Sequence, residues 1–148
     1  GHQAYQFPRC NRFMGRWLRH GEGYPDMGIR LFNRNSAQWS EALVHESVLS
    51  TVLPGTLDGD LMHDSALTLQ RYLEKQNIYT SLQAEEMYQA GKQAGAGKLL
   101  FNPLHRFFKF YIFRLGFLDG VPGLIHILIG CQNTFLKYAK LIDLQRNK

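Results

Sequence analysis

Residues 17–46, WLRHGEGYPDMGIRLFNRNSAQWSEALVHE, gather many of the chain's chemically versatile side chains. Two glycines and a proline among the first ten of these residues favour a turn-rich loop. Such a loop can hold His20, Glu22 and Asp26 toward one ligand, whereas a helix would spread them around its surface. The run Gly28–Phe32 then alternates from side to side as a strand does.

A second strand is predicted over Leu43–Leu49. Because successive side chains of a strand point to opposite faces, His45 and Glu46 would point to opposite sides. Only one of them could then face a given pocket, unless a β-bulge intervenes.

Two further strands are predicted in the first 63 residues, over Gln3–Arg9 and Asp60–His63. Pro8 has no backbone N–H, and it therefore indicates that the first of these strands ends at a sheet edge. Residues 11–18 combine aromatic side chains with arginines. Such a segment can stack on a base or sugar and pair with a phosphate, or its rings belong to the core and its arginines are solvated.

The pattern changes to a helical period after residue 64, and it predicts a helix over Ser65–Gly91 with Asp64 or Ser65 as its N-cap. Glycines near residues 91–97 end this helix and form a hinge, and Pro103 opens a different segment. We therefore expect an α/β chain, with an α+β arrangement of short strands, a long helix and a C-terminal amphipathic helical hairpin. The expected parts are residues 1–63, 64–98 and 99–148.

The C-terminal hairpin is rich in aromatic and basic residues, as in LHRFFKFYIFRLGFL at residues 104–118. The uncharged run that follows has too few strongly apolar residues for the ~20 that a spanning helix needs. A hairpin lying in a membrane interface fits this composition, and a buried helix pair in a soluble core is the alternative.

Length and composition indicate one domain or part of one: 148 residues, 45% hydrophobic and 20% charged, with a net charge of +5. The positive charge suggests an anionic partner such as a nucleotide, a phosphorylated glycan or an anionic lipid. The basic residues are scattered, so we do not expect nucleic acid. Cys10 and Cys131 form no CxxC pair, which favours two reduced thiols in a cytosolic protein. The chain does not begin with Met, and we expect it to be a fragment.

Several acids, histidines and one arginine in the strand-and-loop region are candidates for sugar or phosphate chemistry. A carboxylate could take a proton from an attacking hydroxyl, a histidine with carboxylates could hold a metal, and arginine could neutralise phosphate. The residues alone predict a phosphate- or sugar-handling site, with or without a metal. The candidates are His20, Glu22, Asp26, Arg30, His45, Glu46, Asp60 and His63.

The segments RWLRHGEGYPDMGIRLFNR, LVHESV, DLMHDSALTLQRYLEKQNIYT, RFFKFYIFRLGFLDGVPGLIHILIG and FLKYAKL, in this order, resemble the C-terminal half of bacterial family 2 glycosyltransferases. The closest group is the lipopolysaccharide core transferases of the WaaE type, which are β-1,4-glucosyltransferase-like. The resemblance covers about residues 4–145. It implies a GT-A fold, transfer from a nucleotide-sugar donor with inversion, and Mg or Mn. The donor-binding half with its DxD motif has no counterpart here, so the metal would be held mostly outside this chain.

The resemblance also assigns residue roles. An inverting transferase needs a carboxylate base, for which Glu46 is the first candidate and Asp26 the second. The substrate-binding candidates are His20, Arg30, Trp17 and His45. The candidate contact to a metal or a diphosphate is His63, with His45 as the alternative.

The acceptor implied by the resemblance is a lipid-linked glycan, such as a lipopolysaccharide core. The protein would then act in the cytoplasm, peripherally on the inner face of the bacterial inner membrane, with the hairpin on the membrane surface. The alternative is a module that binds membrane or glycan and does no chemistry.

Overall fold

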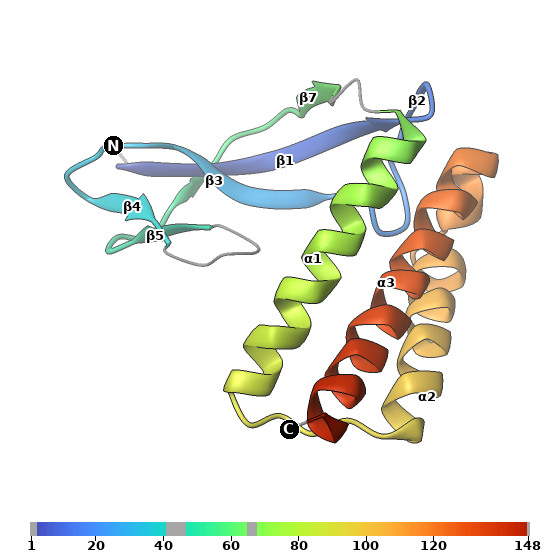
Figure 1. The fold of residues 1–148 in the computed structure, drawn as a ribbon. Helices are drawn as coiled ribbons and strands as arrows, with labels where there is room; N and C mark the ends of the chain where they lie inside the picture. Colours follow the sequence, from blue (N-terminus) through green and yellow to red (C-terminus); the bar gives the residue numbers. More distant parts are fainter. Residues whose placement is uncertain (1–2, 41–46, 65–67, 148) are drawn as a thin grey trace.

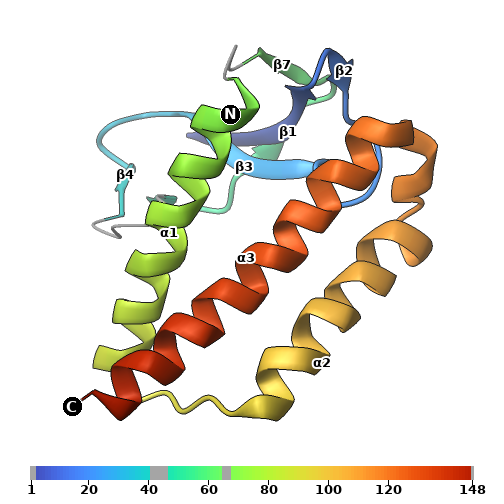
Figure 2. The same cartoon turned by 45° about the vertical axis from the view of Figure 1, so that its right-hand side comes forward.

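The computed structural model describes residues 3–40, 47–64 and 68–147, which form a small mixed sheet beside three helices. Helix α3 lies between α1 and α2, and the sheet lies across one end of the three helices (Figures 1 and 2). The C-terminus lies at the other end. The expected order of short strands, one long helix and a helical hairpin is confirmed, and the combination of sheet and helices agrees with the α/β class.

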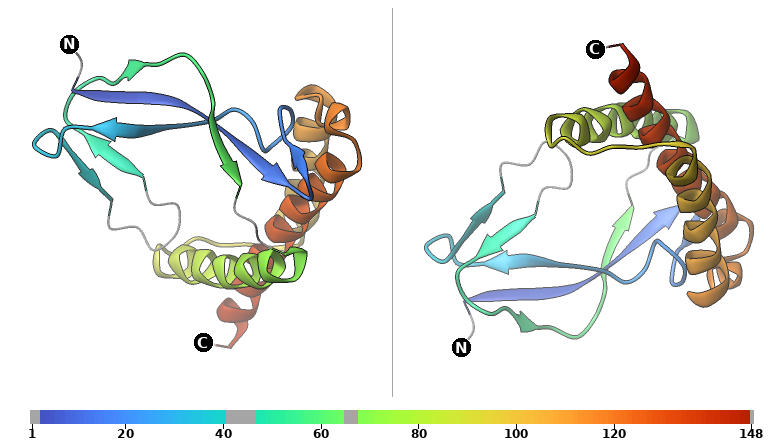
Figure 3. Two further views of the ribbon diagram at one scale, coloured as in Figure 1. Left: turned by 90° about the horizontal axis from the view of Figure 1, so that it is seen from above. Right: turned by 90° about the horizontal axis from the view of Figure 1, so that it is seen from below.

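The main sheet is built around one long strand, β1 (Ala4–Phe13). Antiparallel to it run β3 (Asp26–Phe32), which confirms the strand predicted over Gly28–Phe32, and β2 (Arg16–Trp17). Parallel to it run β6 (Gly55–Thr56) and β7 (Leu61–Asp64), and β7 matches the strand predicted at Asp60–His63 within one residue at each end. Figure 3 shows these strands beside different parts of β1.

The expectation that Pro8 ends β1 at a sheet edge was wrong, because β1 is the central strand and continues to Phe13. Along one side of β1, the pairing with β6 stops at Gln6 and the pairing with β7 starts at Arg9. Pro8 therefore lies at the break between two short partner strands, where a missing N–H costs no ladder hydrogen bond on that side.

A separate two-stranded sheet, formed by β4 (Ala37–Trp39) and β5 (Val48–Ser50), lies beyond the end of β3. The strand predicted over Leu43–Leu49 reaches into β5 with its last two residues. Ser47 lies just before this strand, and the remaining predicted residues, 43–46, which include His45 and Glu46, lie outside the described residues.

Helix α1 (Leu69–Gln89) starts later than predicted. Asp64 is the last residue of β7, and the N-cap is Thr68, whose side-chain oxygen accepts the N–H of Arg71 at 3.3 Å. Ser65 lies outside the described residues. The helix therefore starts at Leu69, after the strand β7 has ended at Asp64.

The hairpin consists of α2 (Ala96–Phe107) and α3 (Gly120–Arg146), joined by a π-helical segment at Phe108–Phe113 and a 3₁₀ segment at Gly116–Asp119. Pro103 lies inside α2 rather than opening it, which corrects the prediction. Proline in a helix interior removes one backbone hydrogen bond, and α2 is supported by its packing along α3. The boundary expected between residues 98 and 99 also falls inside α2.

In the described part of the chain, no single helix is long and apolar enough to cross a membrane. The segments Ala96–Phe113 and Gly116–Arg146 satisfy length and composition only as a pair, and that pair is bent by 74°.

The core lies where α3 packs against α1 and against the sheet region. Ile127 and Leu141 of α3 are almost fully buried, as are Leu18 and Cys10 from the sheet region. At the solvent edge of the α1–α3 contact, the Lys140 ammonium donates to the hydroxyl of Thr80 at 2.8 Å and to two oxygens of Asn77. Helix α3 therefore has one face in the core, whereas no described residue of α2 is buried, so the alternative of a buried helix pair holds for α3 only.

Candidate functional site

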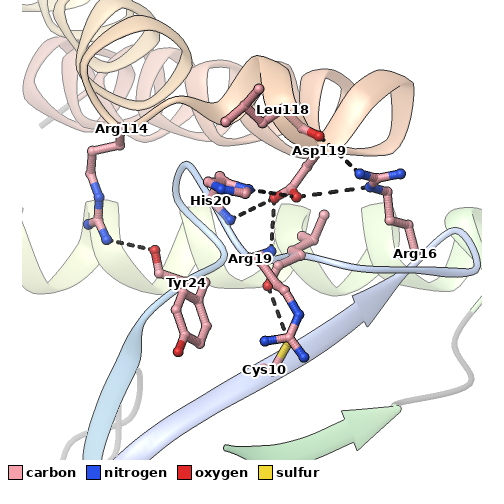
Figure 4. A network of polar contacts seen from close by, with 9 residues as sticks. Cys10, Arg16, Arg19, His20, Tyr24, Arg114, Leu118 and Asp119 are labelled. Atoms are coloured by element: carbon pink, nitrogen blue, oxygen red, sulfur yellow. Dashed lines mark hydrogen bonds and ion pairs between the residues drawn. The ribbon is translucent and has the colours of Figure 1, made fainter.

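The loop at residues 18–25 is fixed against the break in the helical hairpin by a buried carboxylate, Asp119 (Figure 4). One oxygen of Asp119 accepts the backbone N–H groups of Arg19 at 3.0 Å and His20 at 2.8 Å. The other oxygen lies 3.1 Å from Nδ1 of His20 and 3.9 Å from Nε of Arg16. Since the Asp119 side chain is only 3% exposed, these contacts satisfy a charge that burial would otherwise penalise.

Close packing of backbone on backbone completes this junction. The N–H of Gly21 donates to the carbonyl of Arg114 at 2.8 Å. A Cβ at Gly21, whose φ is +65°, would lie only 3.1 Å from the Cα of Gly116 and from Cδ1 of Ile127. Only glycine permits this approach, and the loop therefore sits directly on the turn between α2 and α3.

A second carboxylate, Asp60, holds the other side of the same loop. It accepts from the guanidinium of Arg19 at 3.1 Å and from the hydroxyl of Tyr24 at 2.9 Å. The hydrogen bond to Asp60 raises the pKa of Tyr24. Arg114 donates to the carbonyl of Tyr24 at 2.6 Å, which links the loop again to the hairpin (Figure 4).

The third anchor is an ion pair between Glu22 and Arg106 of α2. Arg106 donates from Nε at 3.2 Å and also from Nη2, and its guanidinium lies 5.4 Å from the ring centre of Phe110. Gly130 of α3 leaves room for the Glu22 carboxylate, because a Cβ there would overlap it. Glu22 is therefore an anchor between loop and helices in this structure.

Asp26, the second candidate for a base, lies at the start of β3 within an ion-pair cluster. Its carboxylate is 2.6 Å from Nη2 of Arg9 and 3.3 Å from Nη2 of Arg30. Burial lowers the pKa of Arg30, whose Nε is buried without a hydrogen-bond partner. The carboxylate oxygens thus have two cationic neighbours, and Arg30 already faces an anion within the chain.

The other predicted site residues are dispersed rather than gathered at one point. His20 contacts Asp119, and its side chain is 36% exposed. Trp17 packs against Arg12, whose guanidinium lies 5.6 Å from the ring centre. His63 lies on β7, with Nδ1 at 3.1 Å from the side-chain oxygen of Asn11.

The described residues do not fit a divalent metal by themselves. Among them, no three histidine, cysteine or carboxylate side chains are grouped so that they could hold a metal ion. The ring of His63 is already paired with an amide.

A cleft of about 940 Å³ lies between β1, β7 and the first half of α1. Of the predicted site residues that the structure describes, only His63 lines this cleft. The described lining residues are Arg9, Asn11, Arg12, Phe13, Met14, Gly15, Leu18, His63, Asp64, Leu69, Tyr72, Lys75, Gln76, Tyr79 and His126. Burial raises the pKa of Tyr72 to about 12 and lowers the pKa of His126. Both groups are therefore neutral at neutral pH.

Sequence reasoning missed Asp119 and the partners of the loop on the hairpin, Arg106 and Arg114. A weak signal was present, because Asp119 is the one acid in residues 87–142, beside a glycine and after a basic aromatic run. A lone acid in an apolar segment needs a partner when it is buried. The partners were not predictable, since they lie about 100 residues away.

The chain is similar over about three quarters of its length to curated glycosyltransferases. The lipopolysaccharide core biosynthesis glycosyltransferase LpsC of Rhizobium meliloti is 30% identical over 116 residues, which are 76% of this chain and 43% of that protein. Uncharacterized glycosyltransferases of Rickettsia prowazekii and Rickettsia typhi are both 28% identical, over 124 and 125 residues. Each of these matches covers 78% of this chain, and they cover 42% and 43% of the relatives.

The chain thus spans less than half the length of the relatives it matches. No family model matches the chain, and no solved structure matches it. The relatives agree with the expected resemblance to glycosyltransferases, one of them named for the lipopolysaccharide core. The finer assignment to family 2 and to the WaaE type stays a prediction.

Proposed function

We propose that this chain forms the acceptor-side part of a glycosyltransferase that moves a sugar from a nucleotide-sugar donor to a lipid-linked glycan, such as a lipopolysaccharide core. The observation that carries the proposal is the similarity to glycosyltransferases along three quarters of the chain. The finer parts of the proposal are a GT-A fold of family 2, inversion at the transferred carbon, and Mg or Mn held mainly outside this chain.

The proposed base is Glu46, which would take the proton of the attacking acceptor hydroxyl. It lies outside the described residues, so its place rests on the resemblance alone. Asp26 is the second candidate, and its contacts with Arg9 and Arg30 support a structural role beside any chemical one. Both arginines are paired with Asp26 in this structure, so Asp26 would have to act as a base while it holds these ion pairs.

The proposed location is the cytoplasmic face of the inner membrane. Around the break in the hairpin, large apolar side chains are exposed, among them Phe113 at 80% and Val121 at 67%. Lys109 and Arg114 lie on either side of Phe113 in sequence. Exposed aromatic side chains beside basic ones suit an anionic membrane interface, where rings enter the headgroup region and cations meet lipid phosphates. An acceptor anchored in the same membrane would then be held near the protein.

The test is Glu46→Gln in the full-length protein, with transfer of labelled sugar to a lipid-linked acceptor as the readout. We expect transfer to fall by about 100-fold or more, because the amide cannot accept the proton. Donor binding, measured by calorimetry, should stay within a few-fold. The matched control is Glu86→Gln, which changes an exposed glutamate of α1.

Unchanged turnover in Glu46→Gln would remove Glu46 as the base and leave Asp26. A full-length protein that binds acceptor but transfers no sugar from any nucleotide sugar would contradict the proposed activity and favour a binding module.

A further inference from the structure

The cleft between β1 and α1 has an aromatic wall. The rings of Phe13 and Tyr72 meet edge to face at 5.3 Å between centres, and Phe13 and His126 meet in the same way at 5.2 Å. These three rings come from the sheet, α1 and α3, so they are held in place by the packing of the whole fold. A rigid apolar wall with a few polar groups is typical of a small-molecule site.

The described side chains that line the cleft carry a net positive charge. Three are cationic (Arg9, Arg12 and Lys75) and one is a carboxylate, Asp64. Arg12 pairs with Asp64 at 3.0 Å, and Arg9 pairs with Asp26. Lys75 has no carboxylate partner among the described residues. The cleft therefore keeps a cation that can meet an external anion.

The cleft adjoins the exposed apolar end of the hairpin. Met14 and Gly15, the turn between β1 and β2, line the cleft. The next residue, Arg16, donates from its guanidinium to the carbonyl of Leu118 at 2.9 Å (Figure 4). Leu118 is itself 47% exposed beside the break in the hairpin. A ligand in the cleft would thus lie close to the surface that we propose faces the membrane.

We propose that this cleft binds a saccharide that carries a carboxylate or a phosphate. Lys75 and Arg12 would contact the anionic group, and Tyr72 and Phe13 would pack against the apolar side of the sugar ring. Asn11 and Gln76, which also line the cleft, supply amide groups for hydroxyls. The binding itself needs no transfer reaction, whereas the identity of this saccharide as part of the acceptor rests on the proposed function.

The test is a titration of the 148-residue chain, followed by backbone amide NMR shifts, with four probes. Glucuronate and glucose 6-phosphate carry the proposed chemistry, glucose is the neutral comparison, and uridine diphosphate glucose represents a donor. We expect saturable shifts around residues 72–79 with both acidic sugars, and at least tenfold weaker binding of glucose. We further expect Lys75→Gln to weaken binding of the acidic sugars by about threefold to tenfold and to leave glucose unchanged.

The matched control is Lys92→Gln, which removes the same charge beyond the end of α1 and outside the cleft. Equal effects of Lys75→Gln and Lys92→Gln would show attraction by net charge only and would overturn the proposal. Equal affinity for glucose and glucuronate, or saturable shifts with the uridine diphosphate sugar alone, would also overturn it. If the full-length protein transfers no sugar but the cleft still binds acidic sugars, the proposed function is wrong and the proposed binding site is still supported.

Discussion

Replacing Asp119 by alanine should lower the free energy of unfolding by about 3–4 kcal/mol. The Asp119 carboxylate accepts two backbone N–H groups, from Arg19 and His20, at 3.0 and 2.8 Å in a nearly buried position. Each buried donor that loses its only acceptor costs about 1–3 kcal/mol. The contact with Arg16 at 3.9 Å adds little, because the Arg16 side chain is 51% exposed and exposed ion pairs are weak.

The measurement is urea unfolding followed by circular dichroism. With a denaturant slope of about 1–3 kcal/mol per molar urea, the midpoint should fall by more than about 1 M. Asp119→Asn keeps one acceptor oxygen and should lose roughly half as much. The difference between wild type and Asp119→Ala should persist in about 1 M salt, because salt screens exposed ion pairs far more than buried hydrogen bonds.

The matched control is Asp143→Ala, an exposed aspartate near the other end of α3. It should change the free energy of unfolding by less than about 0.5 kcal/mol. A loss below about 1 kcal/mol in Asp119→Ala would refute the reasoning, since it would mean that water or the loop itself satisfies the two N–H groups.

Two further changes test other parts of the structure. Burial lowers the pKa of His126 below its ordinary value of 6.5, so the unfolded chain binds this proton more readily and stability should fall as the pH drops below about 6.5. His126→Gln should flatten that part of the pH dependence of urea unfolding and His105→Gln should not; equal slopes in wild type and His126→Gln would contradict the assignment. Phe113→Asp should weaken binding to anionic vesicles by about tenfold or more in a flotation assay, because an aromatic side chain contributes about 1.5–3 kcal/mol when it is buried. Leu53→Asp, at an equally exposed position far from the hairpin, should bind as wild type does, and a similar loss in both variants would argue against a membrane face at the hairpin break.

Local signals in the sequence predicted the parts of the fold that depend on neighbours along the chain. Alternation over Gly28–Phe32 indicated β3, and the helical period after residue 64 indicated α1. The start of α1 was misplaced by a few residues, since Asp64 suits both a cap and a strand end. Pro8 and Pro103 were misinterpreted because the rules for proline assume regular neighbours. Pro8 lies at a gap between two partner strands, and Pro103 lies in a helix that α3 supports.

In the candidate site, too, local features were predictable from the sequence and contacts between distant residues were not. The glycines and proline of the central loop were sufficient to predict a loop, and the polar residues in it were sufficient to predict that it carries function. Its conformation is set by Asp119, Asp60 and Arg106, which are 36 to 100 residues away along the chain. No pattern within the loop encodes those contacts, because they depend on how the hairpin folds back onto the sheet. Of the two bases proposed from the resemblance, Asp26 is paired with Arg9 and Arg30 rather than with these anchors, and Glu46 lies outside the described residues.

These anchors give the loop a mechanical role that follows from their positions. Asp119 and Arg114 tie the loop to the break in the hairpin, and Asp60 ties it to the segment that leads into β7. Arg16 extends the same connection from the turn that lines the cleft to Leu118. The exposed apolar end of the hairpin is therefore joined to the cleft region by short hydrogen bonds and ion pairs, some part-buried and some exposed, rather than by a flexible linker. If that end enters a membrane, the cleft takes a fixed orientation relative to the membrane surface, and a lipid-linked saccharide would be presented to it from one direction only.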